Sequence, residues 1–232
     1  MSRLEVFGVG GLPEIQVGAD LAGLICAHVD LLTHDVVVVT QKIVSKAENA
    51  LVDIDPSNPL AHKPIVERES VRVLRRRGEL VISETKHGFV CANAGVDLSN
   101  VARGKAALLP DDSDRSARRI RDGIRGKAGI EVAVIVSDTF GRPWRRGVTD
   151  VAIGSAGIGP ILDLRGSTDA LGRELQVTEI AIVDELAAAA DLVCGKSSGI
   201  PVAVIRGVDP TWLTEGSVAA DLVRRPADDL FR

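Results

Sequence analysis

The amino-acid sequence predicts a mixed α/β fold in which helices cover the faces of β-sheets. Two observations lead to this fold class. Strand-like runs of β-branched residues alternate with runs that carry apolar residues at helical spacing. The chain has 232 residues, of which 45% are hydrophobic and 26% charged, so it can bury a large core. This length fits one large domain or two small interleaved ones.

The first half of the chain is expected to contain two helices and two strands. Apolar residues at helical spacing predict a helix over residues 21–32, and a run of valines predicts a buried strand over 35–40. A basic stretch with apolar residues on one face predicts a helix over 67–77, ahead of a strand over 79–83. Prolines predict a loop over 53–64.

The second half repeats this alternation. A basic segment over residues 113–127 is predicted to be helical, because isoleucines recur one turn apart and an aspartate stands in its first turn. The apolar run over 131–136 is the strongest signal for a buried strand. An alanine-rich helix over 178–193 and a strand over 201–205 complete the expected elements.

Composition excludes several classes of protein. The 28 basic and 32 acidic residues give a net charge of −4, and aromatic residues make up 3% without a single tyrosine, so nucleic-acid binding is not expected. Cys26, Cys91 and Cys194 form no CxxC pair, which argues against a disulfide framework or a cysteine zinc site. No apolar run approaches the roughly 20 residues that span a bilayer. We therefore expect no membrane partner and a cytoplasmic location.

Three short motifs fail on closer reading. Pro13 stands where the dinucleotide fingerprint needs its third glycine. Gly195-Lys196-Ser197 resembles the end of a phosphate-binding loop, but it lies between a helix and a strand, the reverse of the required order. Ser197 also sits in a GxSxG match, yet every histidine precedes it in the chain, so a serine hydrolase is disfavoured.

A polar segment over residues 137–147 is the most informative motif. It follows the strongest predicted strand, and ligands of open sheets gather at the carboxyl ends of strands. Asp138 and Thr139 supply oxygen ligands of the kind that Mg²⁺ or Mn²⁺ prefers. Arg142, Arg145 and Arg146 suit an anionic, phosphorylated ligand. The alternative interpretation is a strand end followed by a solvated basic loop.

Three further segments are weaker candidates. The glycine-rich turn over residues 10–15 brings backbone N–H groups within reach of a ligand, although such clusters are more often plain turns. Asp97 and Asn100 lie three residues apart, a pattern that also suits an Asx turn. Lys46 follows the valine-rich strand and would suit a phosphate, but lysines commonly face solvent.

These segments together resemble one family, the coenzyme F420-0:L-glutamate ligases. The resembling blocks are Gly11–Glu14, Val37–Glu48, Ala94–Asn100, Ser137–Arg146 and Asp191–Gly207. They are collinear and extend over residues 8–207. The resemblance implies two interleaved subdomains, an intertwined homodimer, and GTP-dependent formation of γ-glutamyl amide bonds on coenzyme F420-0 with L-glutamate as the amine, through an acyl phosphate.

The resemblance also implies roles for individual residues. Its nucleotide contacts match Leu12, Pro13, Glu14, Ile15, Gln41, Lys46 and Asn100. One divalent ion, Mg²⁺ or Mn²⁺, matches Asp97 and Asp138, and a second matches Thr139. The residues expected to serve catalysis are Asp138, Lys46 and Arg142. The role of Arg142 comes from its charge and not from the resemblance, and Arg142, Arg145 and Arg146 are expected to contact phosphate or polyglutamate. Potassium is also associated with the family, although no residue here predicts it.

Two positions depart from the family pattern. Gln41 stands where serine is common, and its amide can still form hydrogen bonds. Archaeal relatives have an acidic residue near position 195 for the second metal, whereas this chain has Lys196. We therefore hypothesise either that the second metal site is lost or that the charge of Lys196 replaces it.

The resemblance also sets the expected domain boundaries and alternatives. Residues 1–223 are expected to form the ligase domain, and residues 224–232 a C-terminal tail or the start of a linker, as in actinobacterial two-domain proteins with a flavin-binding domain. One alternative is a non-catalytic F420- or nucleotide-binding module that needs such a fused domain. The other is a nucleotide-dependent ligase for a different carboxylate acceptor.

Overall fold

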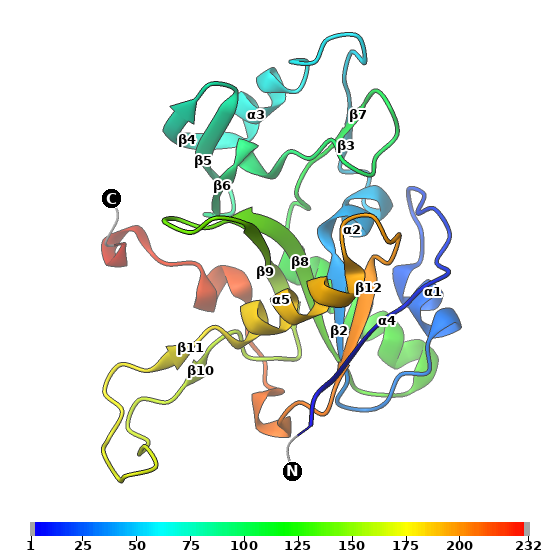
Figure 1. Cartoon of the computed structure of the whole chain (residues 1–232). Coiled ribbons are helices and arrows are strands. Elements are labelled where there is room, and N and C mark those ends of the chain that lie inside the picture. The colour runs from blue at the N-terminus through cyan, green and yellow to red at the C-terminus, as the bar shows by residue number, and fades with distance from the viewer. Residues whose placement is uncertain (1–2, 230–232) are drawn as a thin grey trace.

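A mixed five-stranded sheet forms the centre of the molecule (Figure 1). The structure is a computed structural model that describes residues 3–229. The strand order is β1-β12-β2-β8-β9, and β2 and β8 run parallel while the other neighbours are antiparallel. The strands are β1 (Glu5–Gly8), β2 (Val36–Thr40), β8 (Ala133–Gly141), β9 (Val148–Ala156) and β12 (Val202–Arg206). The predicted mixed α/β class is confirmed.

Helices cover both faces of this sheet, because its central strands are apolar on both sides. Side chains alternate along β2, so Val37 and Val39 pack on one face and Val36 and Val38 on the other. The first face is covered by α1 (Leu21–His28) and α4 (Ser113–Ala128), and the second by α5 (Ile182–Cys194). Two hydrophobic cores therefore lie back to back across the sheet.

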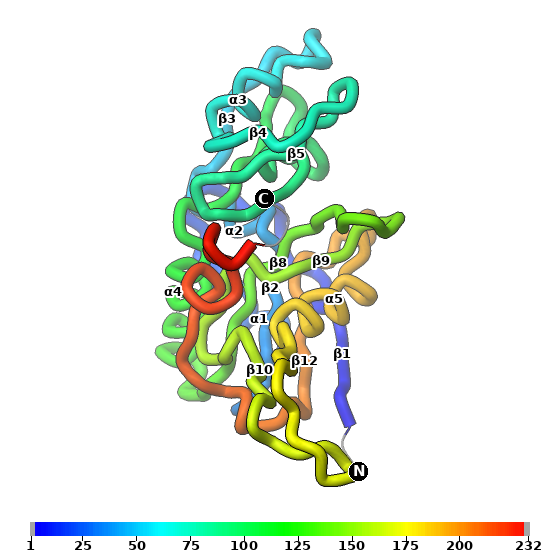
Figure 2. Tube along the Cα trace, turned by 90° about the vertical axis from the view of Figure 1, so that its left-hand side faces the viewer, coloured from blue at the N-terminus to red at the C-terminus, as the bar shows by residue number. Residues whose placement is uncertain are grey.

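An insert over residues 51–107 forms a second unit with its own small core. Its elements are β3 (Leu51–Asp53), α3 (Lys63–Glu69), β4 (Ser70–Arg77), β5 (Leu80–Thr85), β6 (Val90–Ala92), the 3₁₀ helix η1 (Asn93–Gly95) and β7 (Lys105–Ala107). Ile65, Val66, Val81 and Ala106 are buried together in it. Figures 1 and 2 both show the insert beyond α2 (Gln41–Ala47), so the second unit interrupts the first in sequence.

An arm extends from the opposite end of the molecule in both views (Figure 2). It is stiffened by antiparallel pairing of β10 (Leu162–Asp163) with β11 (Glu179–Ile180). After β12 the chain forms short 3₁₀ and π turns, η2 (Pro210–Trp212), η3 (Val218–Leu222) and η4 (Pro226–Asp228). The helix predicted over 178–193 is thus confirmed from Ile182, while its first residues belong to the arm.

The helix predicted over residues 67–77 is wrong. The helix α3 ends at Glu69, and residues 70–77 form β4, which pairs with β5 through a tight turn at Gly78. The sequence Ser-Val-Arg-Val-Leu-Arg alternates apolar and basic residues, so it also fits the period of a strand. Pairing with β5 decides between the two, because tertiary contacts override a short periodic signal.

The helix expected over residues 21–32 ends earlier, at His28, where Val29 takes an extended conformation. The remaining expected elements fit the structure, but some predictions are untested. Residues 35–40, 79–83, 113–127, 131–136 and 201–205 contain the expected strands and helix. Residues 3–229 contain no helix with the length and apolar character needed to cross a membrane. The cytoplasmic location and the boundary at residues 223/224 stay predictions, and the last three residues of the expected tail lie outside the described residues.

Asp114 fastens the start of α4 to two distant segments. Its buried carboxylate accepts hydrogen bonds from the backbone N–H groups of Ser155 at 2.8 Å, Val218 at 2.9 Å and Ala219 at 3.0 Å. Gly154 makes this approach possible, because a Cβ atom there would lie 2.3 Å from the carbonyl carbon of Ser113. One aspartate therefore satisfies three backbone donors that have lost access to water.

We predict that Asp114→Ala lowers the free energy of unfolding by about 3 kcal/mol or more, since it leaves buried N–H groups without acceptors. Urea titration followed by circular dichroism measures this loss. Asp122→Ala, on the exposed face of the same helix, is the control and should change stability by no more than about 0.5 kcal/mol. Equal stability of the two variants would contradict the proposed role of the Asp114 carboxylate in fastening α4 to the two distant segments.

Candidate active site

The parallel pair β2 and β8 brings two polar segments to one edge of the sheet. Thr40 lies opposite Ser137 in the register, so α2 leaves the sheet beside the polar end of β8. The polar segment over residues 137–147 was expected to follow the strand as a turn, and this is wrong for its first part. Residues 137–141 continue β8 and pair with β9. Only the segment after Gly141 forms the turn. The strand therefore holds Asp138 and Thr139 in fixed, opposite directions.

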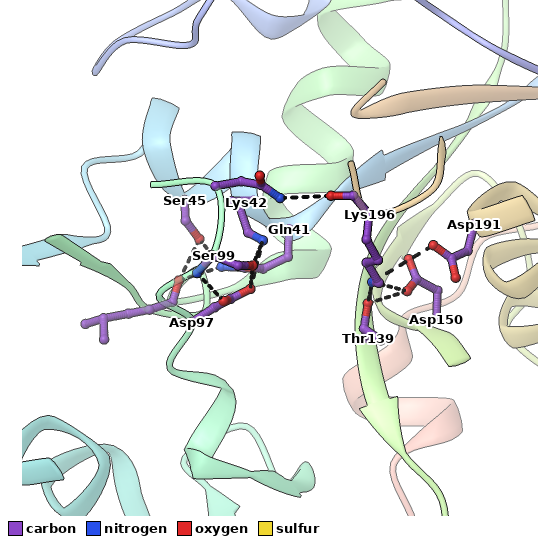
Figure 3. Close-up of polar contacts among 11 residues, drawn as sticks. Gln41, Lys42, Ser45, Asp97, Ser99, Thr139, Asp150, Asp191 and Lys196 are labelled. Atoms are coloured by element: carbon purple, nitrogen blue, oxygen red, sulfur yellow. Dashed lines mark hydrogen bonds and ion pairs between the residues drawn. The ribbon is translucent and has the colours of Figure 1, made fainter. Parts of the chain in front are cut away.

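Asp97 joins the insert to α2 through a charge pair. Its carboxylate lies 2.8 Å from the Nζ atom of Lys42 and accepts hydrogen bonds from the backbone N–H and hydroxyl of Ser99 (Figure 3). Its backbone pairs with Ala107 at the end of β7. Burial alone would raise the pKa of Asp97, but the Lys42 and Ser99 hydrogen bonds and the Lys42 charge outweigh it and lower the pKa. Asp97 is therefore ionised at neutral pH, the form in which a carboxylate can bind a cation.

Asp138 lies near Asp97 but in a different electrostatic setting. Burial of its carboxyl raises the pKa to about 7, and the negative charges of Asp97 and Asp150 act in the same direction. A carboxyl that is desolvated between two other carboxylates favours a bound cation, since an ion would offset the repulsion. Asp97 and Asp138 thus fit the expected divalent ion, although no three His, Cys, Asp or Glu side chains gather into a metal site within the described residues.

Thr139 belongs to a second polar group on the opposite face of β8. It stands opposite Asp150 in the β8–β9 register and donates a hydrogen bond of 2.5 Å to the Asp150 Oδ1 atom. Ser137 donates to the other oxygen of the same carboxylate. Lys196 completes the group by donating to the Thr139 hydroxyl (Figure 3). An ammonium group at this position does not fit the second divalent ion that Thr139 was expected to bind.

The turn over residues 10–15 is tied to α2 by an ion pair. The Nζ atom of Lys46 lies 2.5 Å from the Oε1 atom of Glu14, and Lys46 is buried while Glu14 is exposed. Pro13 is exposed and Leu12 packs partly against the core, whereas Ile15 is buried within it. Among these predicted nucleotide contacts, the side chain of Ile15 is therefore not accessible to a ligand.

Gln41 and Asn100 face different surroundings. Gln41 is buried, and its amide donates hydrogen bonds to the Ser45 hydroxyl and to the carbonyl oxygen of Leu108. Its side chain therefore holds α2 against the segment that follows β7. Asn100 is exposed with a left-handed φ of 52°, and its amide donates to the carbonyl oxygen of Lys196 at 3.3 Å. This bond connects the insert to the loop after α5.

The three arginines lie apart from the carboxylates. Arg142, Arg145 and Arg146 are exposed in the turn between β8 and β9, and the guanidinium of Arg142 donates to the carbonyl oxygen of Arg146. Trp144 is also exposed, with a left-handed φ of 56°. The structure therefore places the predicted catalytic Arg142 on the tip of a hairpin and not beside Asp138.

Sequence reasoning gave no role to Lys42, Ser99, Asp150 and Asp191. Lys42 lies in the block Val37–Glu48 and Ser99 in the block Ala94–Asn100, but the sequence does not show which residues contact them. Asp150 carries a detectable signal, because it is a lone carboxylate in the largely apolar run 148–153. Asp191 carries none, since an acidic residue near the end of a surface helix is ordinary.

The arrangement combines cationic side chains with carboxylates at one edge of the sheet. Lys42 and Lys46 extend from α2, and both are paired with carboxylates. Such a site can bind an anionic phosphate through ammonium groups and a divalent ion through Asp97 and Asp138. It can therefore neutralise charge during a group transfer between anions.

Comparison with known proteins shows the family of this chain. Residues 10–207 match the family described as F420-0:Gamma-glutamyl ligase. A coenzyme F420:L-glutamate ligase of Methanothermobacter thermautotrophicus is 41% identical over 99% of each chain. A protein of the same name from Methanopyrus kandleri is 39% identical over 97% of this chain and 100% of its own. From the turn at Gly10 to the end of the last strand, this chain belongs to the F420-0:gamma-glutamyl ligase family.

Proposed function

We propose that this chain is a coenzyme F420-0:L-glutamate ligase that uses GTP. The main support for this proposal is that the chain belongs to the family over nearly its whole length. The paired lysines and carboxylates at the carboxyl ends of β2 and β8 support it as well. The number of glutamates added is left open. The homodimer and the potassium ion stay predictions.

The proposed reaction has two steps, because a carboxylate is a poor electrophile. A carboxylate oxygen of F420-0 attacks the γ-phosphorus of GTP, GDP leaves, and an acyl phosphate forms. The amine of L-glutamate then attacks the acyl carbon, and inorganic phosphate leaves as the nitrogen loses a proton. The products are an amide, GDP, phosphate and a proton, and the amide is γ-linked where the acceptor carboxylate is the γ-carboxylate of an earlier glutamate. Enzymes accelerate such steps chiefly by positioning and charge neutralisation.

The residues of this chain supply both of these effects in the proposal. Lys46 lies buried beside the turn at Glu14. Its ammonium group can hold a nucleotide phosphate after the ion pair with Glu14 has broken. Asp97 and Asp138 would hold one Mg²⁺ or Mn²⁺, which screens phosphate charge when bound. Lys42 keeps Asp97 ionised and oriented. Exposed arginines at the β8–β9 turn are available to an acidic acceptor.

Mass spectrometry of the deazaflavin product tests the reaction. The chain is incubated with F420-0, L-glutamate, GTP and Mg²⁺ or Mn²⁺, and matched samples omit GTP or contain ATP. A glutamyl-extended product that needs GTP supports the proposal. Nucleotide binding without any product favours the non-catalytic module, and GTP turnover only with another carboxylate favours a ligase for a different acceptor.

We predict that Asp138→Asn lowers kcat by at least about 100-fold, because the amide keeps the shape of the side chain but removes a negative ligand. Product formation and Mn²⁺ binding are measured on the same samples. Asp163→Asn, which alters an exposed carboxylate on the arm, is the matched control and should keep full activity. A wild-type rate in Asp138→Asn would remove this residue from the mechanism.

We predict that Lys46→Met weakens GTP binding by about 10- to 100-fold, which is the usual loss for a hydrogen bond to a charged group. The methionine keeps the buried hydrocarbon of the side chain. Isothermal calorimetry measures the affinity, and Lys63→Met, in an exposed pair with Glu79, is the control. Unchanged GTP affinity in Lys46→Met would mean that this lysine serves only to hold Glu14.

We predict that Mn²⁺ binding weakens below about pH 7. The raised pKa of Asp138 means that its carboxyl carries a proton at lower pH, and the ion must displace this proton. Apparent affinity should fall by about tenfold per pH unit below this point and level off above it. Titration of free Mn²⁺ by electron paramagnetic resonance measures both limbs. Asp138→Asn should lack the pH step, and a flat wild-type profile from pH 6 to 8 would contradict the assignment.

A further inference from the structure

The ammonium group of Lys196 lies among three oxygen-bearing side chains from different elements. It donates a hydrogen bond to the Thr139 hydroxyl on β8. It lies 3.4 Å from the Oδ1 atom of Asp150 on β9 and 3.9 Å from the Oδ1 atom of Asp191 on α5. Figure 3 shows these side chains pointing toward one another around the Lys196 Nζ atom. Hydroxyl and carboxylate oxygens are the ligands that a hard metal cation takes in proteins.

The fold fixes the position of Lys196. The helix α5 ends at Cys194, and Gly195 has a φ of 60°, a value in the left-handed region where glycine meets little strain. The next residue is therefore directed back toward β8 and β9. The amide of Asn100 holds the carbonyl oxygen of Lys196 from the other side. A cation just beyond a helix C-terminus also interacts favourably with the helix dipole.

The charge on Asp150 makes this cation necessary. The Asp150 side chain is only 5% exposed, and its two oxygens already accept hydrogen bonds from Ser137 and Thr139. Those hydroxyl groups are neutral, so they leave the negative charge without a counter-ion. Lys196 supplies the charge from a side chain that is 60% exposed and so keeps one side open to solvent. Such a partner offsets the loss of hydration of a buried carboxylate.

We propose that Lys196 is a built-in cation that fills the position of a second divalent ion at Thr139, Asp150 and Asp191. The protein then binds one divalent ion per chain, at Asp97 and Asp138. The inference deepens the proposed function, because it states how many divalent ions the ligase site takes. It depends on that function only for the ion at Asp97 and Asp138.

The number of bound Mn²⁺ ions tests the inference without any measurement of activity. Free Mn²⁺ is titrated by electron paramagnetic resonance at pH 8, with and without GDP, in the wild type and in Lys196→Glu. The variant replaces the ammonium with a third carboxylate beside Asp150 and Asp191. We expect one ion per chain in the wild type and one additional ion in the variant. Lys127→Glu, which makes the same charge change beside Asp20, should bind as the wild type does.

Two outcomes would overturn the inference: a second ion in the wild type, or no additional ion in folded Lys196→Glu. Circular dichroism checks the fold of each variant. If Lys196→Glu does not fold, Lys196→Gln provides the test, since its neutral amide leaves the two aspartates free and should admit a second, weaker ion. Failure of the proposed metal site gives a different pattern, no ion in the wild type and one in the variant.

Discussion

The parallel pairing of β2 with β8 is the constraint on which the site depends. Parallel strands end at the same edge, so the chain that leaves β2 as α2 and the polar end of β8 meet there. The apolar residues of both strands are buried on both faces, which fixes the register through two cores at once. A shift of one residue would exchange the directions of Asp138 and Thr139 and would exchange their partners.

Strand alternation therefore sorts the polar residues into two groups. Asp97, Asp138 and Lys42 form one group, in which Lys42 pairs with Asp97 and the Asp138 carboxyl lies nearby. Thr139, Asp150, Asp191 and Lys196 form the other, in which the lysine lies among the oxygens. The chemistry of the two groups differs because only the first has a carboxyl that is desolvated without a direct ion pair.

Secondary structure could be predicted from the sequence where the spacing of apolar residues matches the surface that the fold buries. The valines of β2 and the isoleucines of α4 lie where their spacing predicts, in the interior. The strand β4 was mistaken for a helix because Val71 and Leu74, three residues apart, suit a helix, whereas Val71 and Val73 suit a strand, and the pairing with β5 is not visible in sequence. The Lys42–Asp97 pair and the Lys196–Thr139 hydrogen bond join residues 55 and 57 positions apart, so only the folded chain could identify these partners.

The insert has its own core, and it meets the rest of the molecule both through the packing of Phe89 against Phe140 and through polar contacts at the site. The Lys42–Asp97 pair and the Asn100–Lys196 hydrogen bond reach across from the insert to α2 and to the loop after α5, and each has an exposed member or a partly exposed one. An ion pair in contact with solvent is weakened by added salt, which screens charges over about 10 Å at 0.1 M ionic strength. The ionic strength of the surrounding solution therefore acts on the Lys42–Asp97 link between the two units, whereas the Asn100–Lys196 hydrogen bond and the packing of Phe89 against Phe140 do not depend on a charge.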